Sequence, residues 1–344
     1  MDDAKLINLN QGENPNELKF DVLKIDSLIK KETIYKEGEN IFQFCKEYDS
    51  SQGEQDQKID IPKYIAKIKT SSFEYLGILS KNLKKENYGY NHFDNGDEYF
   101  GQWNKDKKEG YGVYFFLDEA NPNTKKDIYI GEFKNNVKSG EGIYFKVSKF
   151  DEEKKENNIM PPLDFFLMIG NFLEDNFVKG IIYSIEDGKR IIYKGKMNKE
   201  GKKNDDNAEL YEDDNKVFYG IVKENIMMEG RNIIMKDGKK ETAYYFTLKG
   251  NNSIDSDIDF DYDKGEKDDD KYIKKLNELN NVFDYEKIQD LFISVMKIRE
   301  KANATDNFEY MKKLDYDMDV KQELKDQYGK YLYCWKIILI WKFI

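Results

Sequence analysis

Histidine and cysteine are scarce in this chain of 344 residues, and each scarcity excludes a class of protein. His92 is the only histidine, which excludes histidine-rich metal sites and argues against a histidine-assisted nucleophile. Two cysteines, Cys45 and Cys334, are too few for a disulfide framework, and no apolar signal segment follows Met1. A reducing compartment, cytosol or cilium, is therefore expected.

The sequence motifs of common active sites are also missing. The chain contains no HExxH, GxSxG, GxxxxGK[ST] or clustered CxxC motif. Pairs of carboxylates occur only because acidic residues are abundant. We therefore assign no catalytic residue, no cofactor or cofactor-binding residue and no metal ligand, and we predict that the chain is not an enzyme.

A surplus of basic residues is missing too. The formal net charge is −11, and the tract 251–270 alone carries −7 of it. Because the chain has neither a basic surplus on the repeat region nor a basic tail, nucleic acid is not an expected partner. What the chain does have is 36% charged and 15% aromatic residues. So many aromatic side chains argue against simple disorder.

The stretch YFGQWNKDKKEGYGVYFF, residues 99–116, places aromatic residues and glycines at every second position. In a strand these side chains line one face. Glycine normally weakens a strand, so its recurrence predicts that something bulky lies against the bare backbone. The candidates are neighbouring aromatic rings, which we expect adjoining hairpins to contribute.

This stretch recurs along the chain. The aromatic and glycine positions of the units, which we take as the structural residues of the repeat, are Tyr75, Gly77, Tyr99, Gly101, Trp103, Gly110, Gly112, Tyr129, Gly131, Phe133, Gly140, Gly142, Gly170, Phe172, Gly180, Tyr193, Gly195, Gly220 and Gly230. In this alignment Ile182 and Asn232 replace the second glycine of their units, which predicts distorted or terminal repeats. Polar loops, 121–127 and 149–162, lengthen two of the steps.

Each unit is predicted to be two short strands joined by a polar turn, with Asn-Gly or Asp-Gly pairs leading into the next unit. Fixing about 24 residues is expected to cost more free energy than burying about four aromatic rings provides. One hairpin should therefore fail to fold alone, and stability should come from the array.

The sequences YFGQWNKDKKEGYGVYFF and YIGEFKNNVKSGEGIYF resemble MORN repeats. The resemblance covers about residues 73–250. It implies a mainly β fold, an elongated single-layer antiparallel meander of about six MORN hairpins. Helical spacing outside the repeats predicts flanking α-helices at both ends. Some enzymes carry such repeats, among them plant-type phosphatidylinositol phosphate kinases. In this chain the segments outside the repeats are too short for that kinase domain, and no phosphate-binding glycine loop is visible.

Residues 1–72 form a predicted N-terminal mixed segment and lead-in. Helical spacing predicts a short helix over 17–31, SSQGEQDQK from Ser50 is a predicted linker, and 59–68 is a predicted strand or extended lead-in to the first repeat. Residues 251–270 form a predicted acidic linker. An EF-hand register starting at Asp259 fails because Lys264 stands where glycine is needed and Asp270 replaces the glutamate, so weak cation binding is the lesser alternative.

Residues 271–344 are predicted to form a C-terminal helical region with an apolar tail. Tyr272, Leu276 and Leu279 share one helical face, and two further helices are expected before the tail. They could cover one end of the sheet or pack with a partner. The tail, 331–344, is too short to span a membrane and could dock on protein, lie on a membrane surface or be an artefact of gene prediction.

The expected function is a non-catalytic structural scaffold for protein–protein interactions in a large cytoskeletal assembly. Its partners would be other proteins of the complex, docking as helical or extended segments on the repeat sheet. Resemblance to MORN proteins of radial spokes, together with a residue bias common in protists, suggests a cilium or axoneme. The alternative is a phosphoinositide-binding adaptor between membrane and cytoskeleton, using the apolar tail and turn lysines such as Lys85, Lys105 and Lys108. Protection of a sheet edge is the simpler explanation of those lysines.

Overall fold

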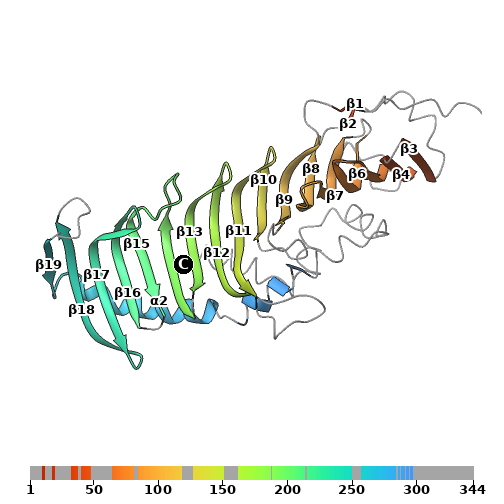
Figure 1. Cartoon of the computed structure of the whole chain (residues 1–344). Helices are drawn as coiled ribbons and strands as arrows, with labels where there is room; N and C mark the ends of the chain where they lie inside the picture. The colour runs from red at the N-terminus through yellow and green to blue at the C-terminus, as the bar shows by residue number, and fades with distance from the viewer. Residues whose placement is uncertain are drawn as a thin grey trace, which may run out of the picture. The chain divides into compact units, whose positions relative to one another are not determined.

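A computed structural model describes residues 10–11, 18–19, 32–37, 40–47, 64–80, 84–117, 127–150, 162–186, 188–213, 215–249, 257–283 and parts of 286–296 (Figure 1). The chain divides into two compact units, whose boundary in the sequence lies between Val137 and Lys138. We call them the N-terminal and the C-terminal unit.

The N-terminal unit is an antiparallel meander in which each strand pairs with the next in the sequence. Its strands are β3 (Glu32–Glu37), β4 (Asn40–Glu47), β5 (Tyr64–Lys69), β6 (Phe73–Leu79), β7 (Lys85–Phe93), β8 (Glu98–Asn104), β9 (Lys107–Phe116) and β10 (Asp127–Lys134). Strands β1 (Asn10–Gln11) and β2 (Leu18–Lys19) pair separately. The sheet thus begins well before residue 73, and β5 extends it as the predicted lead-in.

The C-terminal unit continues in the same way, again with successive antiparallel pairs. Its strands are β11 (Val137–Phe150), β12 (Pro162–Leu173), β13 (Asn176–Glu186), β14 (Lys189–Lys196), β15 (Asp205–Glu212), β16 (Lys216–Lys223), β17 (Ile226–Lys236), β18 (Lys239–Lys249) and β19 (Asp257–Asp261). A 3-10 turn, η2 (Glu266–Asp268), leads into helix α2 (Asp269–Val282). The prediction of a mainly β chain built as an antiparallel meander is confirmed.

Two predictions for the flanks are corrected. The helix expected over 17–31 is wrong at Leu18–Lys19, which form β2, and the rest of that range lies outside the described residues. The acidic linker is wrong at Asp257–Asp261, which pair with β18 as strand β19. In this segment isoleucine and phenylalanine alternate with the aspartates, so one face of the strand is apolar although the tract is acidic. The predicted linker from Ser50, the last predicted helix and the tail 331–344 lie outside the described residues.

The hairpin turns explain why hairpins form here. The two central residues of several turns have positive φ, as in Lys105–Asp106 (49° and 67°) and Asn135–Asn136 (50° and 76°). Turns with both central residues left-handed match the twist of the flanking strands. Asparagine and aspartate tolerate this conformation best among residues with side chains. The polar turns read from the sequence are therefore confirmed as tight hairpin connections.

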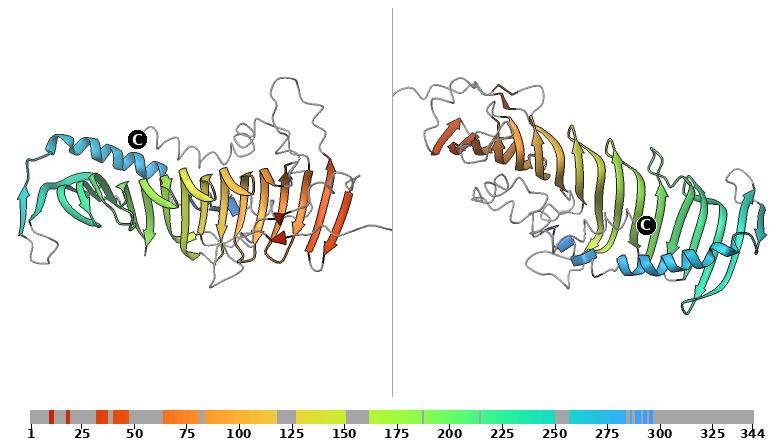
Figure 2. Two further views of the ribbon diagram at one scale, coloured as in Figure 1. Left: turned by 90° about the horizontal axis from the view of Figure 1, so that it is seen from above. Right: turned by 180° about the vertical axis from the view of Figure 1, so that it is seen from behind.

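Strand alternation divides the side chains between two faces of each sheet. One face, which we call the glycine face, carries a row of glycines that pair across neighbouring strands, from Gly77 to Gly131 in the N-terminal unit and from Gly142 to Gly195 in the C-terminal unit. On the other face of the C-terminal unit lies α2, which runs across the strands (Figure 2). We call this the helix face. Leu276 and Leu279 of α2 are buried, which confirms the helical face predicted there.

Candidate interaction surfaces

The glycine row exists because tyrosine rings lie on it. A β-carbon added to Gly89 would stand 2.5 Å from the ring of Tyr75, and one added to Gly112 would stand 2.5 Å from the ring of Tyr99. Such distances do not occur in proteins, so only glycine fits beneath the ring. The aromatic–glycine alternation of the sequence is thus a packing requirement of the folded hairpin.

Each ring also fixes itself to the backbone. The hydroxyl donates a hydrogen bond to the carbonyl three residues later, in Tyr75 to Ile78 (2.8 Å), Tyr99 to Gln102 (2.8 Å), Tyr129 to Glu132 (3.0 Å) and Tyr193 to Lys196 (2.8 Å). These tyrosines are buried. Burial in this environment raises the pKa of Tyr75 and Tyr193, so both stay neutral and able to donate.

The source of the covering ring differs from our expectation. Tyr99 covers Gly101, two residues later on the same strand, and Gly112 on the paired strand of the same hairpin. The adjoining hairpin contributes a second aromatic ring instead: Trp103 packs edge-on against Tyr75 at 5.9 Å between centroids and donates its Nε1–H to the Gly89 carbonyl (3.1 Å). The tyrosine ring of a hairpin therefore covers the glycines of that same hairpin, and an aromatic ring of the next hairpin packs against the tyrosine.

The two glycines of each Gly-x-Gly pair have different roles. Gly112 and Gly142 belong to the glycine row, whereas Gly110 and Gly140 have φ of 67° and 75°. Asn87 takes the corresponding place before Gly89, with φ of 52°. The first glycine therefore supplies a left-handed residue next to an irregularity in the ladder, and the second supplies the space beneath the ring.

This distinction corrects the alignment of the later units. Gly180 pairs with Gly170, and Gly230 pairs with Gly220, so both belong to the glycine row. The glycine that these units lack is therefore the first one. Ile182 and Asn232 are not replacements of the second glycine, and both lie within regular strands.

Lysines enter the same aromatic clusters. The Nζ of Lys85 lies 4.0 Å, 4.8 Å and 4.7 Å from the ring centroids of Phe73, Tyr75 and Trp103, and it donates to the Asn91 amide oxygen at 2.6 Å. Lys108 stands 4.2 Å above Tyr114, and Lys138 lies 4.9 Å above Tyr144. These are cation–π distances.

The lysine row proposed for lipid contact is therefore wrong at Lys85, which is 3% exposed. Two other lysines pair with acids of the neighbouring turns, Lys84 with Asp106 at 2.7 Å and Lys202 with Glu224 at 2.8 Å. Burial lowers the pKa of Lys85 to about 7, and Asp106 opposes this only in part.

A turn clasp joins each of four hairpins to the preceding one. The second central residue of the turn donates its N–H to a lysine carbonyl and accepts the N–H of the same lysine through its side-chain oxygen. The pairs are Asp106 with Lys85 (3.1 and 2.8 Å), Asn136 with Lys108 (3.0 and 2.8 Å), Asp175 with Lys138 (3.1 and 2.9 Å) and Asn225 with Lys203 (3.0 and 2.7 Å). The two residues of these pairs are 21, 28, 37 and 22 residues apart, so no fixed spacing marks the clasp in the sequence, and the prediction of polar turns did not include it.

The glycine face opens into two cavities with equivalent linings. The first, of about 330 Å³ in the N-terminal unit, is lined by Phe93, Asp94, Asn95, Trp103, Asp106, Lys108, Tyr114 and Asn136. The second, of about 220 Å³ in the C-terminal unit, is lined by Lys138, Tyr144, Met168, Phe172, Asp175, Asn176, Phe177, Met197, Asn198 and Gly201. Each has a lysine, a tyrosine and a turn asparagine or aspartate from the clasp. We call them the sockets.

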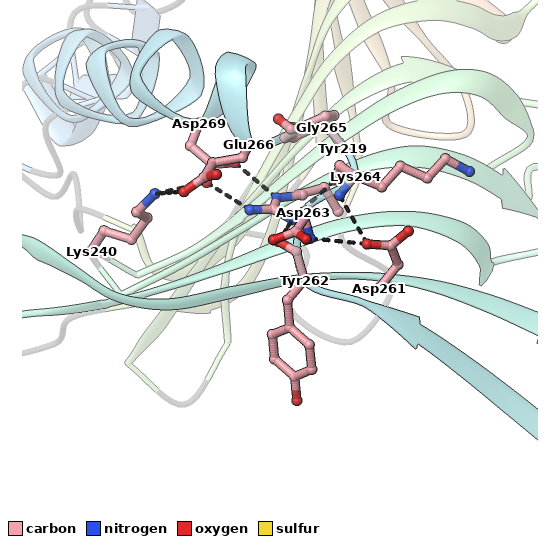
Figure 3. Close-up of polar contacts among 10 residues, drawn as sticks. Tyr219, Lys240, Asp261, Tyr262, Asp263, Lys264, Gly265, Glu266 and Asp269 are labelled. Carbon is pink, nitrogen blue, oxygen red and sulfur yellow. Dashed lines mark hydrogen bonds and ion pairs between the residues drawn. The ribbon is translucent and has the colours of Figure 1, made fainter.

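On the helix face a buried ion pair holds the start of α2 (Figure 3). Arg231 of β17 is 1% exposed and donates from Nε and Nη2 to the two carboxylate oxygens of Asp269, both at 3.0 Å. Its Nη1 donates to the carbonyls of Tyr262 (2.6 Å) and Lys264 (3.0 Å). Lys240 adds a bond to Asp269 at 3.1 Å. We call these contacts the latch.

The pKa values of the latch keep it charged. Burial acts to raise the pKa of Asp269, but the hydrogen bonds from Arg231 and Lys240 outweigh it and hold that pKa below its usual value. The hydrogen bond to Asp269 raises the pKa of Arg231. The pair is bidentate, the arrangement in which arginine binds a carboxylate best.

Further contacts follow along the helix. Tyr272 stacks on Tyr219 with 3.8 Å between centroids, and Lys275 pairs with Glu209 at 2.7 Å. Beyond the end of α2, Phe283 stacks on Tyr183 at 5.3 Å. The helix face thus offers alternating charged and aromatic contacts to a helix lying across its strands.

The described ranges also bear on metal ligands and on membrane-spanning helices. No group of three or more histidine, cysteine or acidic residues there is placed to hold a metal ion. Asp259 and Asp261 of the rejected EF-hand register lie on β19, and the Asp261 carboxylate accepts the backbone N–H groups of Asp263 and Lys264. His92 is an exposed residue of β7, on a strand as predicted. In the same ranges no helix is long and apolar enough to cross a membrane.

Comparison with known proteins agrees with the repeat. The profile of the MORN repeat matches residues 99–118 and 129–148. These are the two units in which both glycines of the Gly-x-Gly pair are present. A search of curated proteins found no significant match. MORN repeats are modules that bind proteins or membrane lipids and are not themselves catalytic. With its glycine row and its two matched units, this chain is a MORN-repeat protein.

Proposed function

We propose that this chain is a non-catalytic scaffold whose glycine face binds segments of partner proteins in a large cytoskeletal assembly. The observation that carries the proposal is the pair of sockets, one in each unit, each lined by aromatic rings, a lysine and carboxylate or amide groups. A concave site that combines aromatic side chains with charged and amide groups suits the side chains of a peptide, which are apolar and polar in turn.

Exposed aromatic residues on the same face support a protein partner. On β19, Phe260 is 57% exposed and Tyr262 beside it is 65% exposed, and Tyr244 packs edge-on against Phe260. Clusters of exposed aromatic side chains mark interaction surfaces more often than single ones do. Such residues anchor interfaces because they bury much area at little loss of conformational freedom.

The membrane adaptor remains the alternative function, and the sockets disfavour it. Asp94 and Asp106 line the first socket and Asp175 the second, so a phosphorylated headgroup would meet carboxylates beside the lysine. A peptide offers both donors and acceptors and can satisfy such a mixed lining. We therefore favour protein over lipid.

For the assembly itself we propose a ciliary axoneme or radial spoke. Support for this location comes from the resemblance of residues 99–116 and 129–145 to the MORN proteins of such structures. A fluorescent fusion in the native cells should lie along the axoneme. A diffuse cytoplasmic signal that salt extraction removes completely would count against this location.

The scaffold proposal is tested by affinity purification from native cells with cross-linking and mass spectrometry. We expect a set of structural companions that Tyr114→Ala and Tyr144→Ala together reduce at least ten-fold. Lys199→Ala, an exposed turn residue outside both sockets, is the matched control and should leave recovery unchanged. Recovery of soluble metabolic enzymes alone, or companions indifferent to the socket variants, would contradict the proposal.

A further inference from the structure

The contacts of α2 define what the helix face recognises. Asp269, Tyr272 and Lys275 follow one another at intervals of three residues and all contact the sheet. This spacing keeps side chains near one face of a helix, with a gradual drift around it. Their partners, Arg231, Tyr219 and Glu209, come from strands β17, β16 and β15 in turn. The face therefore specifies an acid, an aromatic residue and a base, in that order along a helix.

Helix α2 has little stability of its own. It is 14 residues long, its N-cap Asp268 makes no side-chain capping bond, and its last turn contains no basic residue. Isolated helices of this length are marginal in water. Asp269 and Asp270 in the first turn favour the helix dipole, but the missing capping bond and the lack of a basic residue in the last turn weaken the helix. Its helical conformation therefore depends on its contacts with the sheet, so docking and folding of α2 are coupled.

The latch makes the face selective after α2 has left. Arg231 is among the largest fully buried side chains, and without Asp269 its guanidinium would lose the bidentate acceptor. A ligand that covers Arg231 again without an acceptor would bury an unpaired charge, which is strongly unfavourable. Any replacement ligand must therefore bring a carboxylate to the same place. Glu209 would likewise lose the ammonium of Lys275.

We propose that α2 is a displaceable internal ligand of the helix face, and that a partner helix presenting an acid, an aromatic residue and a base at the same spacing replaces it. This proposal adds a class of partner and a means of regulation to the scaffold function. It rests on the scaffold function only where it concerns the natural partner. Because α2 is tethered through residues 262–268, its effective concentration is about millimolar. A partner helix must bind the helix face strongly enough to compete with α2 at this effective concentration. Helix α2 is therefore an autoinhibitory element.

The experiment opens the face by changing only the helix side of the full chain. The triple variant Asp269→Asn, Tyr272→Ala, Lys275→Ala leaves every sheet residue intact. A labelled peptide with the sequence of residues 266–283 is then titrated by fluorescence anisotropy. We expect at least ten-fold tighter binding to the triple variant than to the wild-type chain, in which α2 occupies the face.

Two matched controls test the recognition. The same peptide with Asp269→Asn should bind the opened chain at least ten-fold more weakly, and adding Arg231→Met to the opened chain should remove the gain. Equal binding to wild type and opened chain, no binding to either, or binding indifferent to Arg231→Met would overturn the proposal. If hydrogen exchange shows that the triple variant has lost protection in β13–β17, the single variant Asp269→Asn is titrated and judged by the same criteria. Natural partners play no part here, so failure of this test and failure of the scaffold proposal are distinguishable.

Discussion

A methyl group on Gly101 would lie 2.5 Å from the α-carbon of Gly112 and 2.5 Å from the Tyr99 hydroxyl oxygen. Both contacts are below the distance that real β-carbons show, and one of them is to backbone, which cannot rotate away. At the scale of the residue, glycine is therefore required here by space and not by φ. The same argument applies to Gly77 beneath Tyr75.

The Gly101→Ala variant should lower the free energy of unfolding by about 3 kcal/mol, because overpacking must move a strand or expel a ring. Gly238→Asn is the matched control. Gly238 has φ of 73° and open space around its β-position, and asparagine tolerates that conformation, so a change below about 0.5 kcal/mol is expected. Chemical denaturation measures both, and equal losses would refute the steric explanation.

Lys85 should make stability depend on pH. Its folded pKa is about 7, below the ordinary value of 10.5 in the unfolded chain. Between these values the unfolded chain holds a proton that the folded chain lacks, so the free energy of unfolding rises with pH, by at most about 1.4 kcal/mol per pH unit. Below pH 7 both forms are protonated and the penalty of burying the charge is constant.

Denaturation of wild type and Lys85→Met at pH 7, 8 and 9 measures this effect. The difference in unfolding free energy should move in favour of wild type as pH rises, since methionine keeps the length of the side chain without the titrating group. Lys199→Met, on an exposed turn, serves as control and should show no such trend. A constant difference between wild type and Lys85→Met would contradict the prediction.

At the scale of the element, the turn clasp explains how a hairpin is joined to the one before it. The Asn136 side chain imitates a strand residue, since it accepts the Lys108 N–H while the Asn136 N–H donates to the Lys108 carbonyl. The turn conformation presents both groups to the preceding strand. Residue type, turn geometry and contact between hairpins are thus set by one position.

Three substitutions of Asn136 separate these contributions. Asn136→Asp keeps the acceptor and should be close to wild type in unfolding free energy. Asn136→Gly keeps the conformational freedom but loses the acceptor, at a loss of about 1 kcal/mol. Asn136→Ala loses the acceptor and strains the left-handed residue, whose φ is 76°, for about 2 kcal/mol in total. Thermal or chemical denaturation gives the order, and equal effects of all three would show that the clasp contributes nothing.

At the scale of the whole molecule, charge bears on the choice between protein and membrane. The chain carries a net charge of −11. Of its lysines at or near the turns, Lys108 contacts an aromatic ring, and Lys84 and Lys202 pair with acids. An anionic membrane repels such a chain except where a basic patch is free to face it.

Vesicle flotation tests this choice. With vesicles of phosphatidylcholine and phosphatidylinositol bisphosphate at physiological salt, the chain should remain unbound, both complete and without residues 331–344. A lipid-binding domain of known affinity serves as positive control. Flotation of the complete chain that disappears on removal of 331–344 would favour the membrane adaptor and contradict the protein scaffold.

Much of the fold could be read from the sequence because its rules are local. Alternation at every second residue determined the strands, and the recurrence of Tyr99, Gly101 and Trp103 at Tyr129, Gly131 and Phe133 determined the repeat. Polar turns between them determined the hairpins. Helical spacing of Leu276 and Leu279 determined α2. Each of these patterns depends only on where neighbouring side chains point along the backbone.

What the tertiary structure decided concerns residues distant in sequence. The ladder register showed that Gly180 and Gly230 belong to the glycine row and that β19 is a strand, because register is decided by pairing between strands and not within one strand. Arg231 meets Asp269 38 residues later, and nothing local to either residue marks the contact. Burial of a charge depends on what packs around it in three dimensions. For that reason the sequence determined the repeat, whereas only folding revealed the latch and the sockets.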